Sequence, residues 1–353
     1  MAETEQILHS VDGPIGRIRL NNPKALNSLT EAMCKKMHEL LTGWADDEAI
    51  HAVIVTGEGD RAFCAGGDVR QVCNAGNEDP VAARHFFQVE YAMDLAIAQF
   101  PKPYICLIDG IVMGGGLGIS VNGRYRVLGT NIMAAMPETG IGLLPDVGAT
   151  RFLNACPGRI GMYLGLTGAR MDTADALFVG FGTHHVPSGK FDELLNAFTN
   201  ATYDGEGFST VDDVLSKFAV SPGESKLAAR QAAIDGLFAS DDVEAIMTEL
   251  ENDGSDLAAE AILSLQGMSP TSLKITAKQL ADHPNFSVRD SLILEYRMVA
   301  NVLQRHDFYE GIRAALIDKD RQPKWNPATL PEVSPDEVSA HFETLGAQEL
   351  ALV

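Results

Sequence analysis

Glycine-containing turns that directly follow short apolar segments constrain the fold of this chain more than any other feature. They are the sequences CAGGD at 64–68, MGGGLG at 113–118 and PETGIGLLPDVG at 137–148. Glycine lets the backbone turn sharply and approach a neighbouring group or a ligand without interference from a Cβ atom. Apolar segments that end in such turns and lead into helices are typical of layered α/β proteins, so the sequence predicts this fold class.

Short apolar or β-branched segments in the first half of the chain predict strands. These segments are residues 17–20, 52–57, 104–110 and 125–130. Between the first two, apolar residues repeat at helical spacing after Ser28 and Glu31, whose separation fits a capping box. We therefore expect strands and helices to alternate in this half.

Amphipathic helical patterns replace the strand signals after about residue 185. The expected helices are 190–199, 222–239, 241–252, 255–268, 270–283 and 287–306. Ser269, which precedes Pro270, and Ser287 are suitable N-caps for the last two. We expect an α/β core over 1–200 and a helical region over 201–353, with the polar stretch 200–213 as the softest connection.

Acidic residues outnumber basic ones, with 48 Asp and Glu against 27 Lys and Arg and a net charge of −21. This charge opposes a nucleic-acid backbone or an anionic membrane, so neither is an expected partner. No apolar run reaches the roughly 20 residues of a membrane-spanning helix, and the acidic first residues lack the pattern of a signal or transit peptide. We therefore expect a cytoplasmic protein. If its ligand is an anion, N–H groups and a few cations must hold that ligand locally, against the negative charge of the whole protein.

The five cysteines are scattered without a C-x-x-C pair, which predicts reduced, mostly buried thiols. The nine histidines show no metal-ligand spacing, so we expect no metal and no permanently bound cofactor. The sequence also lacks a phosphate-binding loop and a G-x-S-x-G nucleophile elbow. Cys64 lies in a glycine turn, but without a recognisable partner base we favour a packing role for it over a nucleophilic one.

A helix that begins at Gly115 or Gly116 would direct free N–H groups and the positive end of its dipole towards whatever lies in front of it. Two N–H groups from separate turns are what an oxyanion hole needs when a thioester or ester carbonyl gains negative charge. We assign this role to Gly67 and Gly115. The alternative, that each glycine only permits a tight turn between strand and helix, stays open.

Glu138 and Asp146 each follow a proline that comes after an apolar segment. A carboxyl group near apolar segments is desolvated, which raises its pKa and suits it to acid–base or nucleophilic chemistry. Either residue could instead cap a helix or a turn. Glu90, in the segment FFQVEY, could point into the same space from a helix or could lie on the surface.

Several segments resemble the crotonase, or enoyl-CoA hydratase/isomerase, superfamily. They are LNNPKALNSL at 20–29, AFCAGGDVR at 62–70 and GIVMGGGLGISVNGRYRV at 110–127. The resemblance implies an α/β crotonase (ClpP-like) fold, a spiral of ββα units followed by a helical C-terminal region, with acyl-CoA binding and catalysis in the crotonase core over 1–200. It also implies a coenzyme A thioester as ligand, with the N–H groups of Gly67 and Gly115 as the oxyanion hole.

The resemblance further assigns residues to the substrate and its coenzyme. The backbone of Ala65 would contact adenine, while the residues from Lys24 to Leu26 and Arg70 would lie along the pantetheine and the phosphates. The expected substrate-binding residues are Lys24, Ala25, Leu26, Ala65, Gly66, Asp68, Arg70 and Glu90.

Within the superfamily, the segments 86–91, 135–148 and 307–327 resemble the 3-hydroxyisobutyryl-CoA hydrolase branch. Classical hydratases have a glutamate where this chain has Gly118, so hydration by two glutamates is not expected. The resemblance implies that Glu138 is the catalytic carboxylate, as nucleophile or as base, and that Asp146 is its partner in hydrolysing a short-chain 3-hydroxyacyl-CoA. Two alternative functions stay open: an enoyl-CoA hydratase or carnitinyl-CoA-type dehydratase, and a non-catalytic acyl-CoA-binding protein. Whether the protein forms a homo-oligomer also stays open for each of these functions.

Overall fold

A computed structural model describes residues 5–203 and 205–352 of the chain. Strands form at each of the four segments in the first half for which the sequence predicts them. The larger sheet has the order β1-β2-β3-β5-β7-β9, with β1 antiparallel to β2 and the remaining neighbours parallel. Its strands are β1 (Ile7–Asp12), β2 (Ile15–Leu20), β3 (Ala52–Gly57), β5 (Tyr104–Ile108), β7 (Tyr125–Leu128) and β9 (His184–His185).

A smaller sheet has the order β4-β6-β8, with β4 parallel to β6. Its strands are β4 (Ala62–Cys64), β6 (Ile111–Met113) and β8 (Met133–Ala135). One predicted glycine turn follows each of these strands in chain order. Because the carboxyl ends of parallel strands meet at the same edge of a sheet, the turns after β4 and β6 lie close together.

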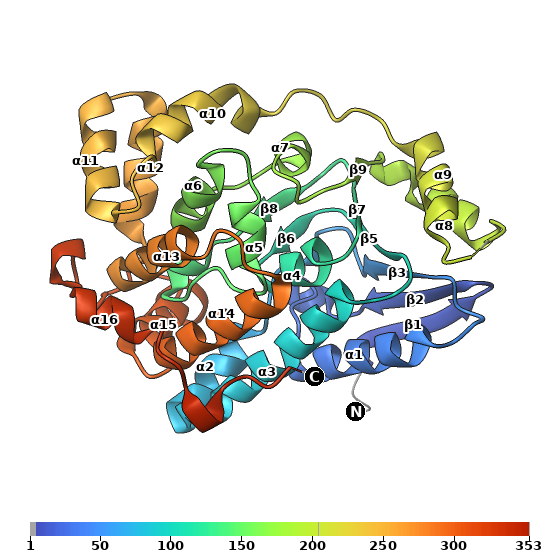
Figure 1. The fold of residues 1–353 in the computed structure, drawn as a ribbon, viewed down its shortest axis with the longest axis horizontal. Coiled ribbons are helices and arrows are strands. Elements are labelled where there is room, and N and C mark those ends of the chain that lie inside the picture. The colour runs from blue at the N-terminus through green and yellow to red at the C-terminus, as the bar shows by residue number, and fades with distance from the viewer. Residues whose placement is uncertain (1–4, 204, 353) are drawn as a thin grey trace. The chain divides into compact units, whose positions relative to one another are not determined.

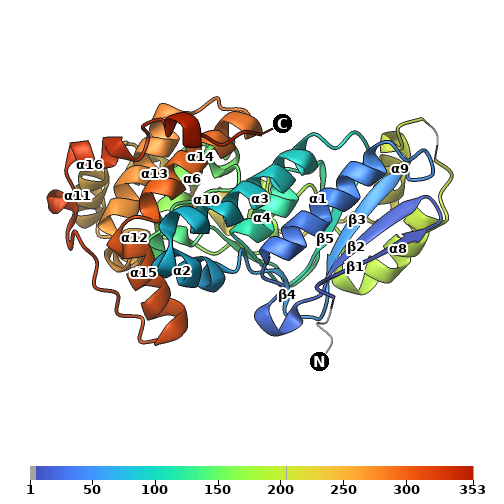
Figure 2. The same cartoon turned by 90° about the horizontal axis from the view of Figure 1, so that it is seen from below.

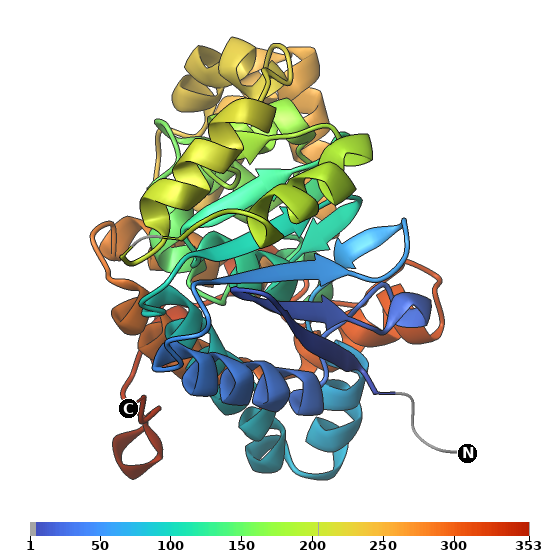
Figure 3. The same cartoon turned by 90° about the vertical axis from the view of Figure 1, so that its right-hand side faces the viewer.

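Helices cover both faces of the larger sheet (Figures 2 and 3). On one face, Trp44 of α1 (Glu31–Ala45) packs so closely on β2 that a Cβ atom at Gly16 would lie 2.7 Å from its ring. On the other face, α8 (Phe191–Thr199) and α9 (Phe208–Phe218) bury apolar side chains against β3, β5 and β7. Because helices cover both faces, the central strands are buried along most of their length, as the burial of Ala52–Val55 in β3 and of all of β5 shows.

Two expectations about these helices were wrong. Thr30, rather than Ser28, is the N-cap of α1, because its side chain accepts a hydrogen bond from the N–H of Met33 at 3.3 Å. Residues 208–213 belong to α9 and are not part of a loose connection. Gly207, at a positive φ of 78°, immediately precedes that helix, and Val211, Val214 and Leu215 supply its buried face.

The Cα positions divide the chain into two compact units that alternate along the sequence. The first comprises residues 1–67, 89–134 and 171–228, and the second comprises 68–88, 135–170 and 229–353. The first unit contains the larger sheet with α1, α4 (Gly115–Val121), α7 (Thr173–Phe178), α8 and α9. The helices α3 (Pro80–Ala98) and α10 (Lys226–Leu237) contribute residues to both units. The division at residue 200 that we expected from the sequence stays a prediction.

The second unit is mainly helical (Figure 1). In it, α6 lies against α5 and α13, and α5 lies against α13 and α14. Its helices are α2 (Val69–Glu78), α5 (Ala149–Asn154), α6 (Ile160–Thr167), α11 (Val243–Asp253), α12 (Asp256–Gly267), α13 (Pro270–Asp282), α14 (Val288–Val302), α15 (His306–Ile312) and α16 (Pro335–Ala340). Ser269 and Ser287 cap α13 and α14 as predicted.

The five cysteines are free and buried, as the sequence predicts. Burial raises the pKa of Cys64 to about 12, which agrees with a packing role for this thiol. Within the described residues, no helix is both long enough and apolar enough to cross a membrane. The same residues contain no group of three His, Cys, Asp or Glu side chains placed to hold a metal ion.

Candidate active site

The turn after β4 is held by the segment that precedes α1. The N–H of Ala65 donates to the carbonyl of Leu26 at 3.0 Å, and the N–H of Leu29 donates to the carbonyl of Gly66 at 2.8 Å. Gly66 has a φ of 108°, a conformation that favours glycine. These bonds place Leu26 beside the glycine turn, as the sequence-based assignment of both segments to one ligand requires.

Gly67 and Gly115 are brought together in the first unit. A Cβ atom on Gly115 would lie 3.2 Å from the backbone nitrogen of Gly67 and 2.5 Å from Oε1 of Glu90. Gly115 is also the first residue of α4, so its N–H has no acceptor within the helix. The two predicted donors therefore come from neighbouring turns, and a side chain at position 115 would collide with Glu90.

The simpler interpretation of the glycines holds for the next position. A Cβ atom on Gly116 would lie 2.2 Å from the carbonyl oxygen of Cys64, so close packing alone requires glycine there. In the turn after β6, close packing therefore explains Gly116, whereas the N–H of Gly115 makes no hydrogen bond within helix α4.

Glu90 lies in α3 and is 2 % exposed, which excludes the surface position that the sequence left open. Its carboxylate lies against Gly115. Burial, followed by the charges of Glu90 and Asp94, raises the pKa of the Cys34 thiol well above its ordinary value. The first unit therefore places a buried acid directly beside the candidate oxyanion donors.

The other expected coenzyme contacts are on or near the surface. Lys24 and Ala25 are exposed in a 3₁₀ turn, Pro23–Ala25, and Lys24 and Leu26 line a hollow of about 210 Å³. Arg70 is exposed and donates to the carbonyl of Leu316. Asp68 caps α2 by accepting from the N–H of Gln71 at 3.2 Å, so a structural role accounts for it.

Glu138 begins a 3₁₀ turn, Glu138–Ile141, in the second unit and is 5 % exposed. The hydroxyl of Thr139 donates to the carbonyl of Leu166 at 3.1 Å, and the N–H of Ser269 donates to the carbonyl of Thr139 at 3.0 Å. Because these bonds come from α6 and from the start of α13, the backbone that carries Glu138 is held on two sides.

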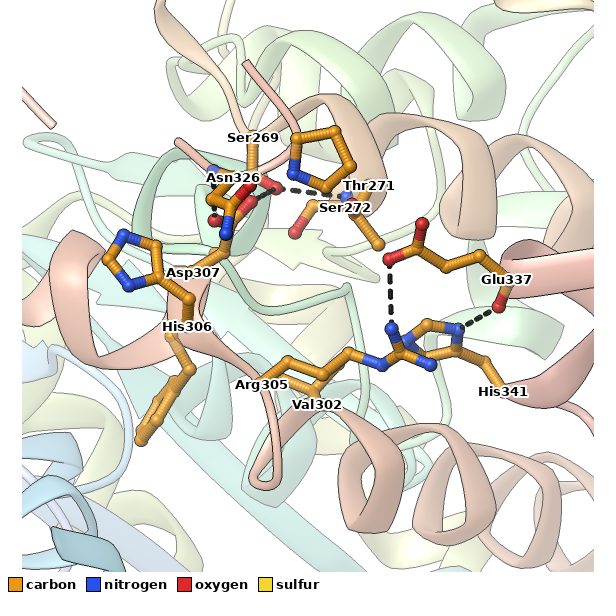
Figure 4. A pocket seen from close by; sticks show the side chains of 13 residues that line it. Ser269, Thr271, Ser272, Val302, Arg305, His306, Asp307, Asn326, Glu337 and His341 are labelled. Atoms are coloured by element: carbon orange, nitrogen blue, oxygen red, sulfur yellow. Dashed lines mark hydrogen bonds and ion pairs between the residues drawn. The ribbon is translucent and has the colours of Figure 1, made fainter. Parts of the chain in front are cut away.

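A cavity of about 350 Å³ is lined in part by Gly142, the residue that follows this turn, and Figure 4 shows side chains that line it. At one end Ser269 donates to Asp307 at 2.6 Å, and at the other Arg305 donates to Glu337 at 2.8 Å. Burial raises the pKa of Asp307. Since the Ser269 hydroxyl joins Asp307 and its backbone joins the Glu138 turn, this network supports the turn.

Asp146 is 4 % exposed and lies in the second unit, in a tight turn in which Val147 and Gly148 have positive φ values of 54° and 94°. The carboxylate of Glu295, from α14, accepts hydrogen bonds from the residues that follow. Glu295 is not among the site residues predicted from the sequence. It shares the buried stripe of α14 with Leu292 and Val299, and an acid in such a stripe is the signal that could have identified it.

Comparison with known proteins identifies the family of the chain. A sequence profile described as enoyl-CoA hydratase/isomerase matches residues 15–342. The chain belongs to the enoyl-CoA hydratase/isomerase family. The chain is also 43% identical over 345 residues, covering 96% of this chain and 89% of the relative, to a Xenopus tropicalis protein named "3-hydroxyisobutyryl-CoA hydrolase, mitochondrial". The human protein of that name is 39% identical over 350 residues, covering 98% of this chain and 90% of the human one.

Solved structures of this family share the fold. One is described as a carnitinyl-CoA dehydratase from Mycobacterium thermoresistibile, with a TM-score of 0.92, 39% identity and coverage of 99% of both chains. Another is described as an enoyl-CoA hydratase from Rhodobacter sphaeroides 2.4.1, with a TM-score of 0.91, 40% identity and coverage of 98% of this chain and 100% of that one. The crotonase fold and the resemblance to the hydrolase branch are confirmed, and the curated relatives are named mitochondrial, so they do not support the expected cytoplasmic location.

Proposed function

We propose that this protein hydrolyses a short-chain 3-hydroxyacyl-CoA thioester, such as 3-hydroxyisobutyryl-CoA, to the free acid and coenzyme A. The observation that carries the proposal is the convergence of Gly67 and Gly115 beside the buried Glu90. Two backbone N–H groups in such an arrangement stabilise the negative charge that a thioester oxygen gains when its carbonyl carbon is attacked. The names of the relatives, which are 3-hydroxyisobutyryl-CoA hydrolases, support the same acyl group.

In the proposed reaction, the thioester oxygen accepts hydrogen bonds from Gly67 and Gly115. Glu138 either attacks the carbonyl carbon or removes a proton from a water molecule that attacks it. The tetrahedral intermediate then collapses, the C–S bond breaks and coenzyme A leaves as its thiolate, which on the water route takes up the proton that Glu138 removed from the water. When Glu138 is the nucleophile, water subsequently cleaves the acyl–carboxylate anhydride and regenerates Glu138.

Asp146 and Glu90 are the two other acids to which we assign a role in binding the substrate. Asp146 holds the substrate hydroxyl or the attacking water, and Glu90 contacts the substrate next to Gly115. The coenzyme lies along Leu26, Ala65 and Gly66, and Lys24 and Arg70 supply positive charge for its phosphates. Local cations of this kind are needed because the net charge of the protein, −21, repels an anionic ligand.

A lyase is the second candidate function. The two solved structures with about 40% identity are described as a dehydratase and a hydratase, which favours this alternative. Against it, Gly118 occupies the position of the first of the two glutamates that a classical hydratase uses, so that only Glu138 remains. Hydrolysis therefore remains the proposal that the residues support better.

The experiment that separates the two candidates follows free thiol and enoyl absorbance together. The purified protein is incubated with 3-hydroxyisobutyryl-CoA and, separately, with crotonyl-CoA. Thiol release from the hydroxyacyl ester, with no absorbance change on crotonyl-CoA, supports the hydrolase. A change in enoyl absorbance without thiol release supports the lyase, and tight binding of both esters without either signal supports a binding protein.

A further inference from the structure

The turn that carries Asp146 is enclosed by a buried hydrogen-bond network. Oε2 of Glu295 accepts from the N–H of Gly148 at 2.7 Å. Oε1 of the same carboxylate accepts from the N–H of Thr150 at 2.8 Å and from the Thr150 hydroxyl at 2.7 Å. Because Glu295 is completely buried and receives three hydrogen bonds, it determines the backbone position directly after Asp146.

A second side chain holds the turn from its other end. Nε2 of Gln279, in α13, donates to the carbonyl of Pro145 at 2.9 Å and to the Thr150 hydroxyl at 2.8 Å. Gln279 is completely buried as well. The hydroxyl of Thr150 therefore links Gln279 to Glu295, and the chain on both sides of Asp146 is bonded to neighbouring helices.

The enclosed turn has a conformation that needs such support. Val147 has a φ of 54°, which is strained for a β-branched residue, and Gly148 follows at 94°. Strain of this kind persists only where surrounding bonds oppose relaxation. The bonds to Gly148 and Thr150 come immediately after the strained residue and keep it in place.

Burial raises the pKa of Glu295 to about 7, and the charge of Asp146 adds to the rise. The two carboxyl groups are thus near enough to affect each other's charge. An acid that is completely buried costs more free energy to keep in place than a neutral side chain of similar size.

We propose that Glu295 is a positioning residue that sets the orientation of the Asp146 carboxylate through Gly148 and Thr150 without touching the substrate. This inference rests on the proposed function, since it requires Asp146 to take part in thioester hydrolysis. It assigns the network formed by Gln279, Thr150 and Glu295 to catalysis rather than to stability alone.

The test uses Glu295→Gln in the full-length protein, with 3-hydroxyisobutyryl-CoA as substrate. The new amide keeps an acceptor for Thr150 but turns an N–H₂ group towards the N–H of Gly148, so two donors face each other. We expect kcat to fall about 10- to 100-fold, because small displacements of a catalytic group have effects of this size, while KM changes less than about threefold.

Asp175→Asn is the matched control for the loss of a buried, multiply bonded carboxylate. Asp175 is 5 % exposed and accepts from the hydroxyl of Ser225 at 2.7 Å and the N–H of Leu227 at 2.9 Å, all in the first unit. Both variants should have lower melting temperatures, but only Glu295→Gln should lose kcat. An equal loss of kcat in the control would overturn the proposal, because a general loss of stability would then explain both results.

Thr150 provides a second variant that avoids changing a buried charge. Thr150→Val removes the hydroxyl that joins Gln279 to Glu295 while keeping the side-chain shape, whereas Thr150→Ser keeps that hydroxyl. We expect a reduced kcat for the valine variant and near-normal kcat for the serine variant. Normal kcat in the valine variant, or equal losses in both, contradicts the proposed network.

A double-mutant cycle with Asp146→Asn separates this inference from the proposed function. If Glu295 acts through Asp146, adding Glu295→Gln to Asp146→Asn should lower kcat no further. Additive losses, or a normal kcat for Glu295→Gln while Asp146→Asn is impaired, overturn the positioning role and leave the proposed function intact. A normal kcat for Asp146→Asn overturns both this role and the function proposed for Asp146.

Discussion

Gly115 meets two requirements with one backbone position. Its N–H is the proposed donor to the thioester oxygen, and the space where a Cβ atom would lie is taken by Glu90 and by the backbone of Gly67. The sequence pointed to this residue because three glycine turns follow strands in order. It could not show that a buried acid lies against the turn, since Glu90 is on a helix whose register with the turn depends on tertiary packing.

Gly115→Ala tests these requirements at the scale of one residue. The added methyl group would displace Glu90 or the Gly67 backbone, so we expect kcat to fall about 100- to 1,000-fold, the usual cost of losing an oxyanion donor. Gly43→Ala is the control, because no atom lies within 4 Å of a Cβ at that helical position and alanine is the better helix former. Steady-state thiol release measures both; a Gly115→Ala enzyme with normal kcat would remove this glycine from the oxyanion site.

The buried carboxyl of Glu295 predicts a pH dependence of stability. Its pKa is about 7 in the folded protein and 4.5 when exposed, so between these values the folded state holds a proton that the unfolded state has released. The stabilisation is present below pH 4.5 and is lost as pH rises to 7, by on the order of 3 kcal/mol. Urea unfolding across this range should show the free energy of unfolding of the wild type falling, relative to that of Glu295→Gln, as the pH rises. A constant difference would contradict the raised pKa.

At the scale of elements, strand β3 was predicted to the residue, because an unbroken apolar run between turn signals has one interpretation. The start of α1 was placed wrongly because Ser28 and Thr30 are both suitable caps, and only the fold decides between them. Helix α9 was missed because Gly205 and Gly207 precede it in a polar stretch. The apolar stripe of α9 packs on the larger sheet. The strand order of that sheet cannot be read from any local sequence pattern, so the sequence does not show that this helix is needed.

The capping correction leads to a stability prediction. Thr30→Ala removes the hydroxyl that accepts from Met33 and that also donates to Gln6 at 2.7 Å, so we expect the free energy of unfolding to fall by about 1 kcal/mol. Ser28→Ala should change it by less than about 0.5 kcal/mol, as for an ordinary surface substitution. Denaturant unfolding of the two variants checks this pair; the reverse order would restore Ser28 as the cap.

For the whole molecule, composition predicted reduced and buried cysteines but could not identify the acids that support the proposed site. Glu295 lies 149 positions after Asp146 in sequence (295 − 146), and the two belong to one unit only because the second unit combines three separate segments. Glu138 and Asp146 could be predicted because each has a local signal, a proline after an apolar segment. A residue that acts through the backbone of a distant turn has no such signal.

The buried cysteines predict the behaviour of the whole chain towards a thiol reagent. All five are buried, and burial raises the pKa of Cys106 and Cys156 to about 12. Because the thiolate is the reactive form, the thiols of the native protein should react slowly with the reagent. In the urea-unfolded protein, all five cysteines should react, one equivalent of reagent for each. Rapid labelling of the native protein would show that a thiol is accessible, and this control is also needed before free coenzyme A is measured by its thiol.

The central claim is tested most directly by Glu138→Gln, with thiol release from 3-hydroxyisobutyryl-CoA and the Kd for that ester measured on the same preparation. We predict that kcat falls at least about 100-fold, because the amide can neither attack the carbonyl nor accept a proton, while Kd changes less than about threefold. Turnover near that of the wild type would contradict the claim, because a group other than Glu138 would then carry the reaction.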